Sequence, residues 1–449
     1  MTRAWRILCD EAELAVECAR RAEVIDLAVE PAIERDPVAA AGASLAAPPT
    51  AVLLAREPDP ASLVELAASA RAADVALPIA VVAPSEEQRR ALQLAGDLGL
   101  VAVDDVTTLL ACMALIGARA QQPWTGSTRA LSALERLQLG PLTSARGGGR
   151  FDRADSGLVS WSARRSGDLI AVGEPRAVGA ALRALEGRTL AAPPARAHVD
   201  GIDRRVVQDV IFGPPRALSD PASKSALAPY GLPLPIEELC SSPSRAAAEA
   251  ARMGFPVRIS LASPDLRTWD HPDLTVDGVD NAARVRDVYR QCMTLASERQ
   301  PDARLLGVHV TATTTARAIL RVVVEPLPRG TVFCEIGFAD PHGRAAGDRT
   351  VTALPAGPDV IERVLGRLGG AGLLLDGGPA HRKTAVAAIA DVLVRVAAFV
   401  SDQREEIDRV ELHPVALLLD GSIEVREACV TVGDAFLRTL EAARPALPR

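Results

Sequence analysis

The stretch that decides the fold reads LSDPASKSALAPYGLPLP at residues 218–235 and SSPSRAAAEAARMGFPVRIS at residues 241–260. In the first segment, Asp220 is a residue type that caps helices, and the proline after it fits the first helical position. Gly231 can adopt the left-handed conformation that ends a helix. This segment therefore predicts a short helix followed by an extended, proline-rich connection.

The second segment predicts a helix and a strand. Ser242 is a capping residue type, Pro243 fits the first turn of a helix, and Gly254 can close that helix. The run from Pro256 to Leu261 predicts a short buried strand. The predicted order is thus helix, extended connection, helix, strand.

With these residues, the order resembles the start of the ATP-grasp module of ADP-forming acyl-CoA synthetases, such as acetate–CoA ligase and succinyl-CoA synthetase. The matching residues are Lys224, the run YGLP at 230–233 and the run GFPV at 254–257, and the resemblance extends to about residue 430. It implies Mg-ATP or Mg-ADP as a cofactor. It also implies the exchange of acyl-CoA, ADP and phosphate for acid, CoA and ATP through a phosphohistidine relay.

The composition bounds the class of protein. The chain of 449 residues is long enough for two or three domains, and its net charge of −7 argues against a nucleic-acid partner, because phosphate binding depends on clustered positive charge. Lysine occurs only at Lys224 and Lys383. The seven cysteines are scattered without a C-x-x-C pair, which predicts reduced thiols in a cytoplasmic protein. The longest apolar run, 384–400, contains Asp391 and Arg395, so no membrane span is expected.

Apolar runs alternate with amphipathic segments in the N-terminal part of the chain. Strands are predicted at residues 4–9, 51–55, 79–82 and 100–103, helices at 11–22, 60–72, 85–96 and 105–119, and an Ala/Pro-rich connection at 37–49. Such alternation is typical of a parallel sheet covered on both faces. We therefore predict a flavodoxin-like or Rossmann-like α/β domain over residues 1–120.

Residues 99–110 resemble the segment that closes the second CoA-ligase subdomain of the same synthetases. That subdomain normally carries a phosphate-carrying histidine. No histidine precedes His198 in this chain, however, and no G-x-G-x-x-G motif follows the first strand, so CoA binding by this domain is not expected. The pair Asp104-Asp105 follows a strand and fits either a helix cap or a metal or phosphoacceptor site.

Residues 121–204 predict a linker and a small insert. The segment 121–157 is rich in turn-forming residues, and its triple glycine at 147–149 leaves a phosphate-binding loop open as an alternative. A β-hairpin is predicted at 158–172 and a helix at 175–186.

Residues 205–449 predict the ATP-grasp-like α+β module. Its expected helices are 281–298, 359–368 and 384–400, and its expected strands are 305–310, 319–324, 332–336, 410–419 and 423–429, the last two joined by a turn at Asp420-Gly421.

Nucleotide phosphates need cations, and the resemblance implies a lysine at the position of Ser260, which carries no charge. Arg258 lies two residues earlier, on the same face of the predicted strand, so it could replace that lysine; a surface or packing role is the alternative. Lys224 matches a family lysine on the first helix. The candidate nucleotide-binding residues are therefore Lys224, Arg258 and Ser260. The basic run at 381–383 fits a solvated helix end or an anion contact.

The loop after this strand departs from the resemblance. Residues 263–266 match, but Thr268 stands in place of the family's second phosphate-carrying histidine and Trp269 in place of its lysine, and no Gly-Gly pair follows. His271 comes three residues late, and His342 stands where the family has an acid in a later glycine-rich segment. No residue is assigned as catalytic.

The resemblance implies Mg²⁺ ligands near the C-terminal hairpin. Glu411 keeps an acid, His413 replaces an asparagine, and Glu427 can supply a second acid from the returning strand. Histidine is a poor ligand for a hard cation. These three residues are therefore the candidate metal ligands, with a transition metal as the alternative to Mg²⁺.

The departures at this site favour a pseudoenzyme of the ADP-forming acyl-CoA synthetases, a structural or regulatory subunit that binds a protein partner or a second copy of itself. The alternative is a divergent acyl-CoA ligase that still binds ATP through Lys224, Arg258, Glu411 and Glu427. A small-molecule sensor that uses the N-terminal sheet is a third hypothesis.

Overall fold

The computed structural model describes residues 4–45, 49–118, 149–153, 159–163, 169–173, 177, 180–181, 184–185, 197–339 and 345–438. These residues form two compact units that divide between Pro193 and Pro194, apart from the segment Leu327–Arg329. Most of the predicted insert lies outside the described residues, so the domain boundaries expected at residues 120 and 204 stay predictions.

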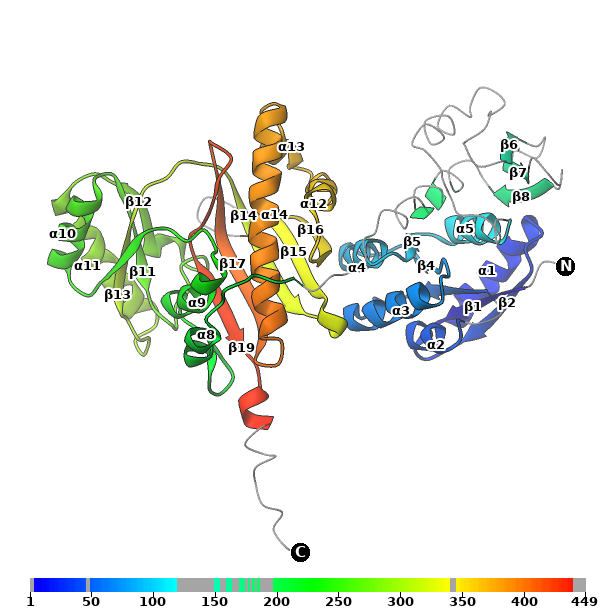
Figure 1. Cartoon of the computed structure of the whole chain (residues 1–449), viewed down its shortest axis with the longest axis horizontal. Helices are drawn as coiled ribbons and strands as arrows, with labels where there is room; N and C mark the ends of the chain where they lie inside the picture. The colour runs from blue at the N-terminus through cyan, green and yellow to red at the C-terminus, as the bar shows by residue number, and fades with distance from the viewer. Residues whose placement is uncertain are drawn as a thin grey trace, which may run out of the picture. The chain divides into compact units, whose positions relative to one another are not determined.

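The first unit contains a five-stranded parallel sheet in the order β2-β1-β3-β4-β5 (Figure 1). Its elements are β1 Trp5–Cys9, α1 Ala12–Val24, β2 Val29–Ile33, α2 Pro37–Ala43, β3 Thr50–Leu54, α3 Pro60–Ala72, β4 Pro78–Val81, α4 Glu86–Asp97, β5 Val101–Val103 and α5 Val106–Ala118. Every residue of β3 and β4 is buried. This strand order is that of flavodoxin-like folds, so the predicted α/β class is confirmed.

Two elements of this unit were not expected from the sequence. The connection predicted at 37–49 contains the helix α2, whose first turn is capped by the Asp36 carboxylate through the N–H of Ala39 at 3.0 Å. Strand β2 pairs with β1 at the edge of the sheet and is largely exposed. An exposed edge strand lacks the apolar run by which buried parallel strands are recognised.

The acidic pair at the end of β5 caps a helix. The backbone N–H of Thr108 donates to Asp105 at 2.8 Å, and the Thr108 hydroxyl donates to the other carboxylate oxygen. The helix-cap interpretation of Asp104-Asp105 is thereby confirmed.

A small antiparallel sheet follows in the order β6-β7-β8, with β6 Gly149–Arg153, β7 Val159–Ala163 and β8 Leu169–Gly173. The predicted hairpin is confirmed by β7 and β8. The linker predicted at 121–157 is wrong at β6, where Gly149 begins a strand, and the other two glycines of the triple lie outside the described residues. The described residues between 177 and 185 are helical, as predicted.

The second unit contains two antiparallel sheets. The smaller has the order β10-β13-β11-β12 and is covered on one face by two helices (Figure 1). Its elements are β10 Glu237–Cys240, α10 Pro243–Met253, β11 Val257–Ala262, β12 Thr275–Val279, α11 Ala282–Arg299 and β13 Gly307–Ala312, with the short helix η2 Pro272–Leu274 before β12. The Ser242 side chain caps α10, Gly254 follows its last residue at a φ of +92°, and β11 is entirely buried, as the sequence predicts.

The larger sheet has seven strands in the order β16-β15-β14-β17-β19-β9, with β18 paired to β17. Its strands are β9 Arg216–Ala217, β14 Ala316–Pro326, β15 Val332–Ala339, β16 Ala345–Leu354, β17 Ile407–Leu418, β18 Ile423–Val425 and β19 Ala428–Val432. Its helices are α8 Arg204–Ile211, α9 Asp220–Leu227, η1 Ala228–Tyr230, η3 Pro328–Gly330, α12 Pro358–Leu365, α13 Ala371–Leu375 and α14 Pro379–Asp402. Among the described residues, α14 is the one helix long and apolar enough to cross a membrane, but 67% of its apolar window is buried in this unit (Figure 1). We therefore identify α14 as a core helix.

Gly307 provides a test of how the smaller sheet is built. It begins β13 at a φ of +126°, and a Cβ atom added there would lie 2.1 Å from the carbonyl oxygen of Cys240 on the neighbouring strand. We expect Gly307→Ala to lower the free energy of unfolding by about 3 kcal/mol or more, because backbone strain and overpacking each cost ~1–3 kcal/mol. Urea unfolding of the whole chain measures this loss.

The matched control is Gly254→Ala. This glycine also has a positive φ, of +92°, but an added Cβ would meet nothing within 4 Å. Only the strain of about 1–2 kcal/mol is expected to be lost. Equal losses in the two variants would contradict the steric explanation.

Candidate functional site

One face of the smaller sheet is polar, although its two central strands, β11 and β13, are almost entirely buried. Arg258 pairs with Thr311 across β11 and β13, and Ser260 pairs with His309. Alternate residues of a strand point to the same side, so these four side chains share a face. The intervening residue Ile259 packs with α10 and α11 on the other face.

The carboxylate of Glu427 meets this polar face from the larger sheet. It lies in the connection between β18 and β19, where its Oε1 is 3.5 Å from Nη2 of Arg258. Its other oxygen accepts a hydrogen bond from the hydroxyl of Thr268, in the loop after β11. Burial raises the pKa of Glu427, while the Arg258 guanidinium opposes that rise. The contacts of Glu427 thus join both sheets and the loop.

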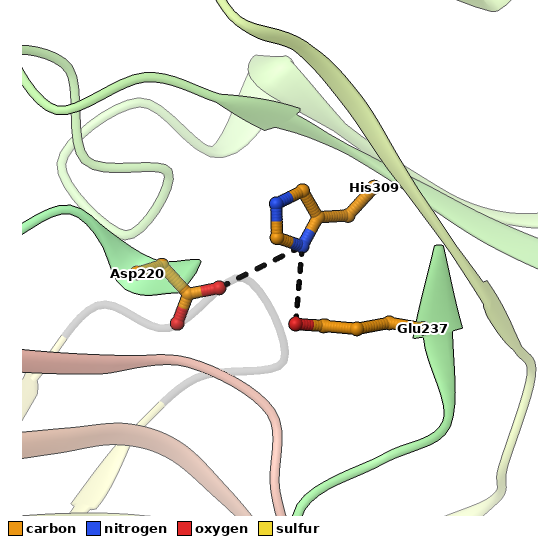
Figure 2. Close-up of side chains that lie close together, drawn as sticks. All are labelled: Asp220, Glu237 and His309. Atoms are coloured by element: carbon orange, nitrogen blue, oxygen red, sulfur yellow. Dashed lines mark ion pairs between the residues drawn. The ribbon is translucent and has the colours of Figure 1, made fainter. Parts of the chain in front are cut away.

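Lys224 is held in a second buried cluster. Its Nζ lies 2.8 Å from Oδ2 of Asp220 and 2.6 Å from Oε2 of Glu237, and the lysine side chain is 7% exposed. Nδ1 of His309 lies 3.3 Å from Oε1 of Glu237 and 3.7 Å from Oδ2 of Asp220 (Figure 2). Lys224 is therefore paired within the protein and does not present a free ammonium group to a ligand.

The charges of this cluster stabilise the charged forms of Glu237 and Lys224, whereas burial outweighs them at Asp220 and raises its pKa. Burial favours the neutral form of Glu237, but the hydrogen bond from His309 and the charge of Lys224 outweigh that effect and lower the pKa of Glu237. Burial likewise opposes the charge of Lys224, yet the carboxylates of Asp220 and Glu237 raise its pKa above the ordinary value. The cluster is a buried ion pair extended by a histidine.

The predicted capping role of Asp220 is wrong. The helix α9 begins at Asp220 itself, and the preceding Ser219 makes no side-chain cap bond. The Asp220 carboxylate instead accepts a hydrogen bond from the backbone N–H of Ala428 at 2.8 Å and pairs with Lys224. It therefore ties α9 to the start of β19.

Asp220, Glu237 and His309 are also the one group, within the described ranges, whose ligand atoms all lie within 4.8 Å of one another, as a metal ion would require. Lys224 lies between the two carboxylates, however, at hydrogen-bond distance from both. The chain's own ammonium group thus supplies the positive charge that a bound cation would supply.

The three candidate metal ligands do not come together in one group. Glu411 lies 2.7 Å from Nε of Arg321, and the ring of His413 stacks on Trp269 with centroids 5.6 Å apart. Glu427 faces Arg258 instead. Each of the three has a separate set of contacts within the protein.

Two polar hollows lie where the sheets meet. The first encloses about 320 Å³, open solvent included, and the second about 420 Å³. Ser260 and Glu427 line both hollows. The first hollow is lined by two basic residues, Arg258 and Arg426, and by four acidic residues, Glu237, Asp277, Glu424 and Glu427.

The remaining candidates lie elsewhere. Lys383 is exposed in the first turn of α14, and its neighbour Arg382 donates to Glu362 at 2.7 Å. His271 directly precedes η2. His342 lies outside the described residues.

Sequence reasoning missed His309, Glu237 and the real role of Asp220. The signal for His309 was the alternation of His309, Thr311 and Thr313 along a strand of otherwise apolar residues, which indicates a polar face on a buried strand. Nothing local marks Glu237, because its partner Lys224 lies thirteen residues away.

Comparison with known proteins agrees with the architecture of the second unit. Residues 213–432 match the ATP-grasp domain family. Two relatives from Pyrococcus furiosus are the beta subunits of ADP-forming acetate–CoA ligases II and I, which are 21% and 24% identical over 217 and 219 residues. These matches cover 48% and 47% of this chain, and 92% and 90% of the two relatives.

One solved structure to which the chain is similar is the dinucleotide-forming acetyl-coenzyme A synthetase 1 of Ca. Korarchaeum cryptofilum. It is 22% identical, with a TM-score of 0.42, over 49% of this chain and 94% of that chain. The resemblance read from the sequence is thus confirmed by the matches to the ATP-grasp family and to ADP-forming acetate–CoA ligases, and the ATP-grasp fold implies a nucleotide cleft in the second unit.

The contact between Thr268 and Glu427 can be tested by an isosteric change. Thr268→Val removes the hydroxyl and leaves a buried carboxylate oxygen without its donor, which costs ~1–3 kcal/mol of unfolding free energy. Thr352→Val is the matched control, since the buried Thr352 hydroxyl has no hydrogen-bond partner among the described residues, and we expect a change within about 0.5 kcal/mol. Indistinguishable unfolding curves for the two variants would argue that Thr268 does not hold Glu427.

The two lysines allow an equally direct test of the buried cluster. Lys224→Met leaves two buried carboxylates without their cation, so we expect a loss of ~3–5 kcal/mol at pH 7. The exposed Lys383→Met should change stability by less than about 0.5 kcal/mol. Denaturant unfolding of both variants measures the difference.

The loss in Lys224→Met should depend on pH. Because the folded pKa of Glu237 is lowered, its ionised form stabilises the wild type above the unfolded pKa, and that stability disappears as the pH falls through the folded pKa. The gap between wild type and variant should therefore narrow as the pH falls below about pH 4, towards the folded pKa of Glu237. A gap that stays constant over this range would contradict the assignment.

Proposed function

We propose that this chain, whose residues 213–432 form an ATP-grasp domain, is a catalytically degenerate relative of the ADP-forming acid–CoA ligases that acts as a structural or regulatory subunit. The observation that carries the proposal is the pairing of Arg258. This guanidinium faces Glu427 at 3.5 Å and Asp277 at 3.8 Å, inside the cleft where a nucleotide's phosphates would need it.

The charges of the cleft argue against a bound triphosphate. Phosphate groups are held by cations and by backbone N–H groups. Lys224 is paired with two carboxylates, and Ser260 carries no charge. A phosphate could recruit Lys224 only by breaking a buried ion pair, which costs several kcal/mol.

The contacts of the candidate metal ligands support the same proposal. Mg²⁺ requires near-octahedral oxygen coordination, usually with carboxylates and waters. Glu411 is bound to Arg321, and the ring of His413 lies against Trp269. Without a shared set of oxygens, these residues offer Mg-ATP no metal bridge to its phosphates.

The relatives indicate what the domain would do instead. The two Pyrococcus furiosus proteins are named as subunits, so proteins of this kind act in assemblies. A chain that keeps the fold without the phosphate chemistry can still contribute an interface. We therefore propose that it binds a protein partner or a second copy of itself.

A divergent ligase that still binds nucleotide is the alternative function. Arg258 and Arg426 both line the first hollow. Two guanidinium groups could hold phosphates if their carboxylate partners moved away.

Calorimetric titration with Mg-ATP and with Mg-ADP distinguishes the two functions. The proposal expects no heat and no thermal shift at millimolar nucleotide, because Lys224, Arg258 and Arg426 already face acids of the protein. Binding at micromolar Kd would overturn it. In that case Arg258→Ala should abolish binding if the site is rebuilt around Arg258, whereas Arg382→Ala, which removes an exposed guanidinium paired with Glu362, should not.

The partner is tested separately, by native mass measurement of the purified chain and of the chain captured from its own cells. A dimer or a stoichiometric partner is expected. A monomer without a partner at micromolar concentration would count against a structural or regulatory role.

A further inference from the structure

The loop between β11 and η2 is fixed at its base. We call residues 263–270 the cleft loop. The Ser263 hydroxyl accepts hydrogen bonds from the backbone N–H groups of Asp265 and Leu266 at 3.1 and 3.2 Å. The Asp265 carboxylate accepts three hydrogen bonds from Arg304, at 2.7 to 3.0 Å. One comes from the backbone N–H of Arg304 and two from the guanidinium group. These contacts stay within the smaller-sheet part of the unit.

The tip of the cleft loop makes different contacts. Thr268 is 5% exposed, and its hydroxyl donates a hydrogen bond to the carboxylate of Glu427. Trp269, 7% exposed, stacks on the ring of His413 at an interplanar angle of 25°. Glu427 and His413 both belong to the larger sheet or its connections, so the tip reaches across from one sheet to the other.

The position of the tip explains why there are two hollows in place of one. Ser260 and Glu427 line both hollows, Arg258 lines only the first, and Thr268 and Trp269 line only the second. The chain of contacts from Arg258 through Glu427 to Thr268 therefore lies between them. Each hollow alone, with about 10 and 30 Å³ of free space, is too small for a nucleotide.

We infer that the cleft loop is an intramolecular plug, which occupies the cleft between the two sheets and excludes nucleotide from it. The inference rests on the proposed function and deepens it, because it names the segment that keeps the cleft empty. The plug is held by its base at Arg304 and by two tip contacts, at Glu427 and His413. Loss of the tip contacts frees the loop to leave, while the base keeps β11 and the smaller sheet intact.

Hydrogen exchange of the double variant Thr268→Ala/Trp269→Leu tests the plug; leucine keeps apolar volume at 269 while removing the ring. The reporters are the amides of Asp270 and His271, which donate to the carbonyls of Arg267 and Thr268 in the wild type. We expect their exchange to rise at least tenfold while β11 amides stay unchanged. The control is Thr275→Ala, since the Thr275 hydroxyl is buried and has no hydrogen-bond partner in the described part of the chain.

The same variants are titrated with Mg-ATP. The double variant should gain binding at millimolar nucleotide, and Thr275→Ala should not. Unchanged exchange at 270 and 271, or faster exchange without any gain of Mg-ATP binding, would overturn the plug. If the double variant does not fold, Thr268→Val alone supplies the test, with a smaller rise in exchange expected at the same two amides and no rise refuting the inference.

Failure of the proposed function gives a different result. Wild-type protein that binds Mg-ATP would refute the non-catalytic role on its own. The plug would then be judged by exchange in the presence of Mg-ATP. Faster exchange at the cleft loop would show that nucleotide displaces the plug, and unchanged exchange would show that there is no plug.

Discussion

The second unit depends on one buried carboxylate. A carboxylate removed from water must be paired and hydrogen-bonded, or its burial costs more than the fold can supply. Glu427, 7% exposed, obtains its partners from Arg258 on the smaller sheet and from Thr268 in the loop that follows. Its own backbone carbonyl accepts from the N–H of His413 at 3.0 Å, in the larger sheet. The need to satisfy this one acid therefore fixes how the two sheets and the loop meet.

The same need decides what the cleft can do. An arginine that satisfies a buried acid is not available to a phosphate, and the ammonium of Lys224 is similarly engaged by Asp220 and Glu237. The ATP-grasp fold is thus kept by contacts that compete with the binding of its ligand. Stability of the two-sheet arrangement and affinity for nucleotide oppose each other, because the buried acids and the nucleotide phosphates would need the same few cations.

The sequence predicted those parts of the fold that local signals specify. The cap at Ser242, the helix-closing glycine at 254 and the buried strand after it all depend on neighbouring residues, and all three are confirmed. The edge strand β2 was not predicted, because most of its residues are exposed. The partners of Asp220 could not be predicted, because one of them, Ala428, is 208 residues away and meets Asp220 only when the larger sheet has formed. For the same reason the sequence could not show that Glu427 would be the partner of Arg258.

The departures from the family pattern are connected through space. Thr268 and Trp269 are neighbours in the loop, and they contact Glu427 and His413, two of the residues that the sequence offered as metal ligands. A cleft that had merely lost its binding residues would leave the remaining polar groups exposed to water or unpaired. Here the replaced positions pack on one another, and the cleft is closed by side chains that suit a protein interior. If the cleft loop is the plug that we propose, a lysine introduced at position 260 alone would not create a phosphate site, because the loop and Glu427 would remain in place.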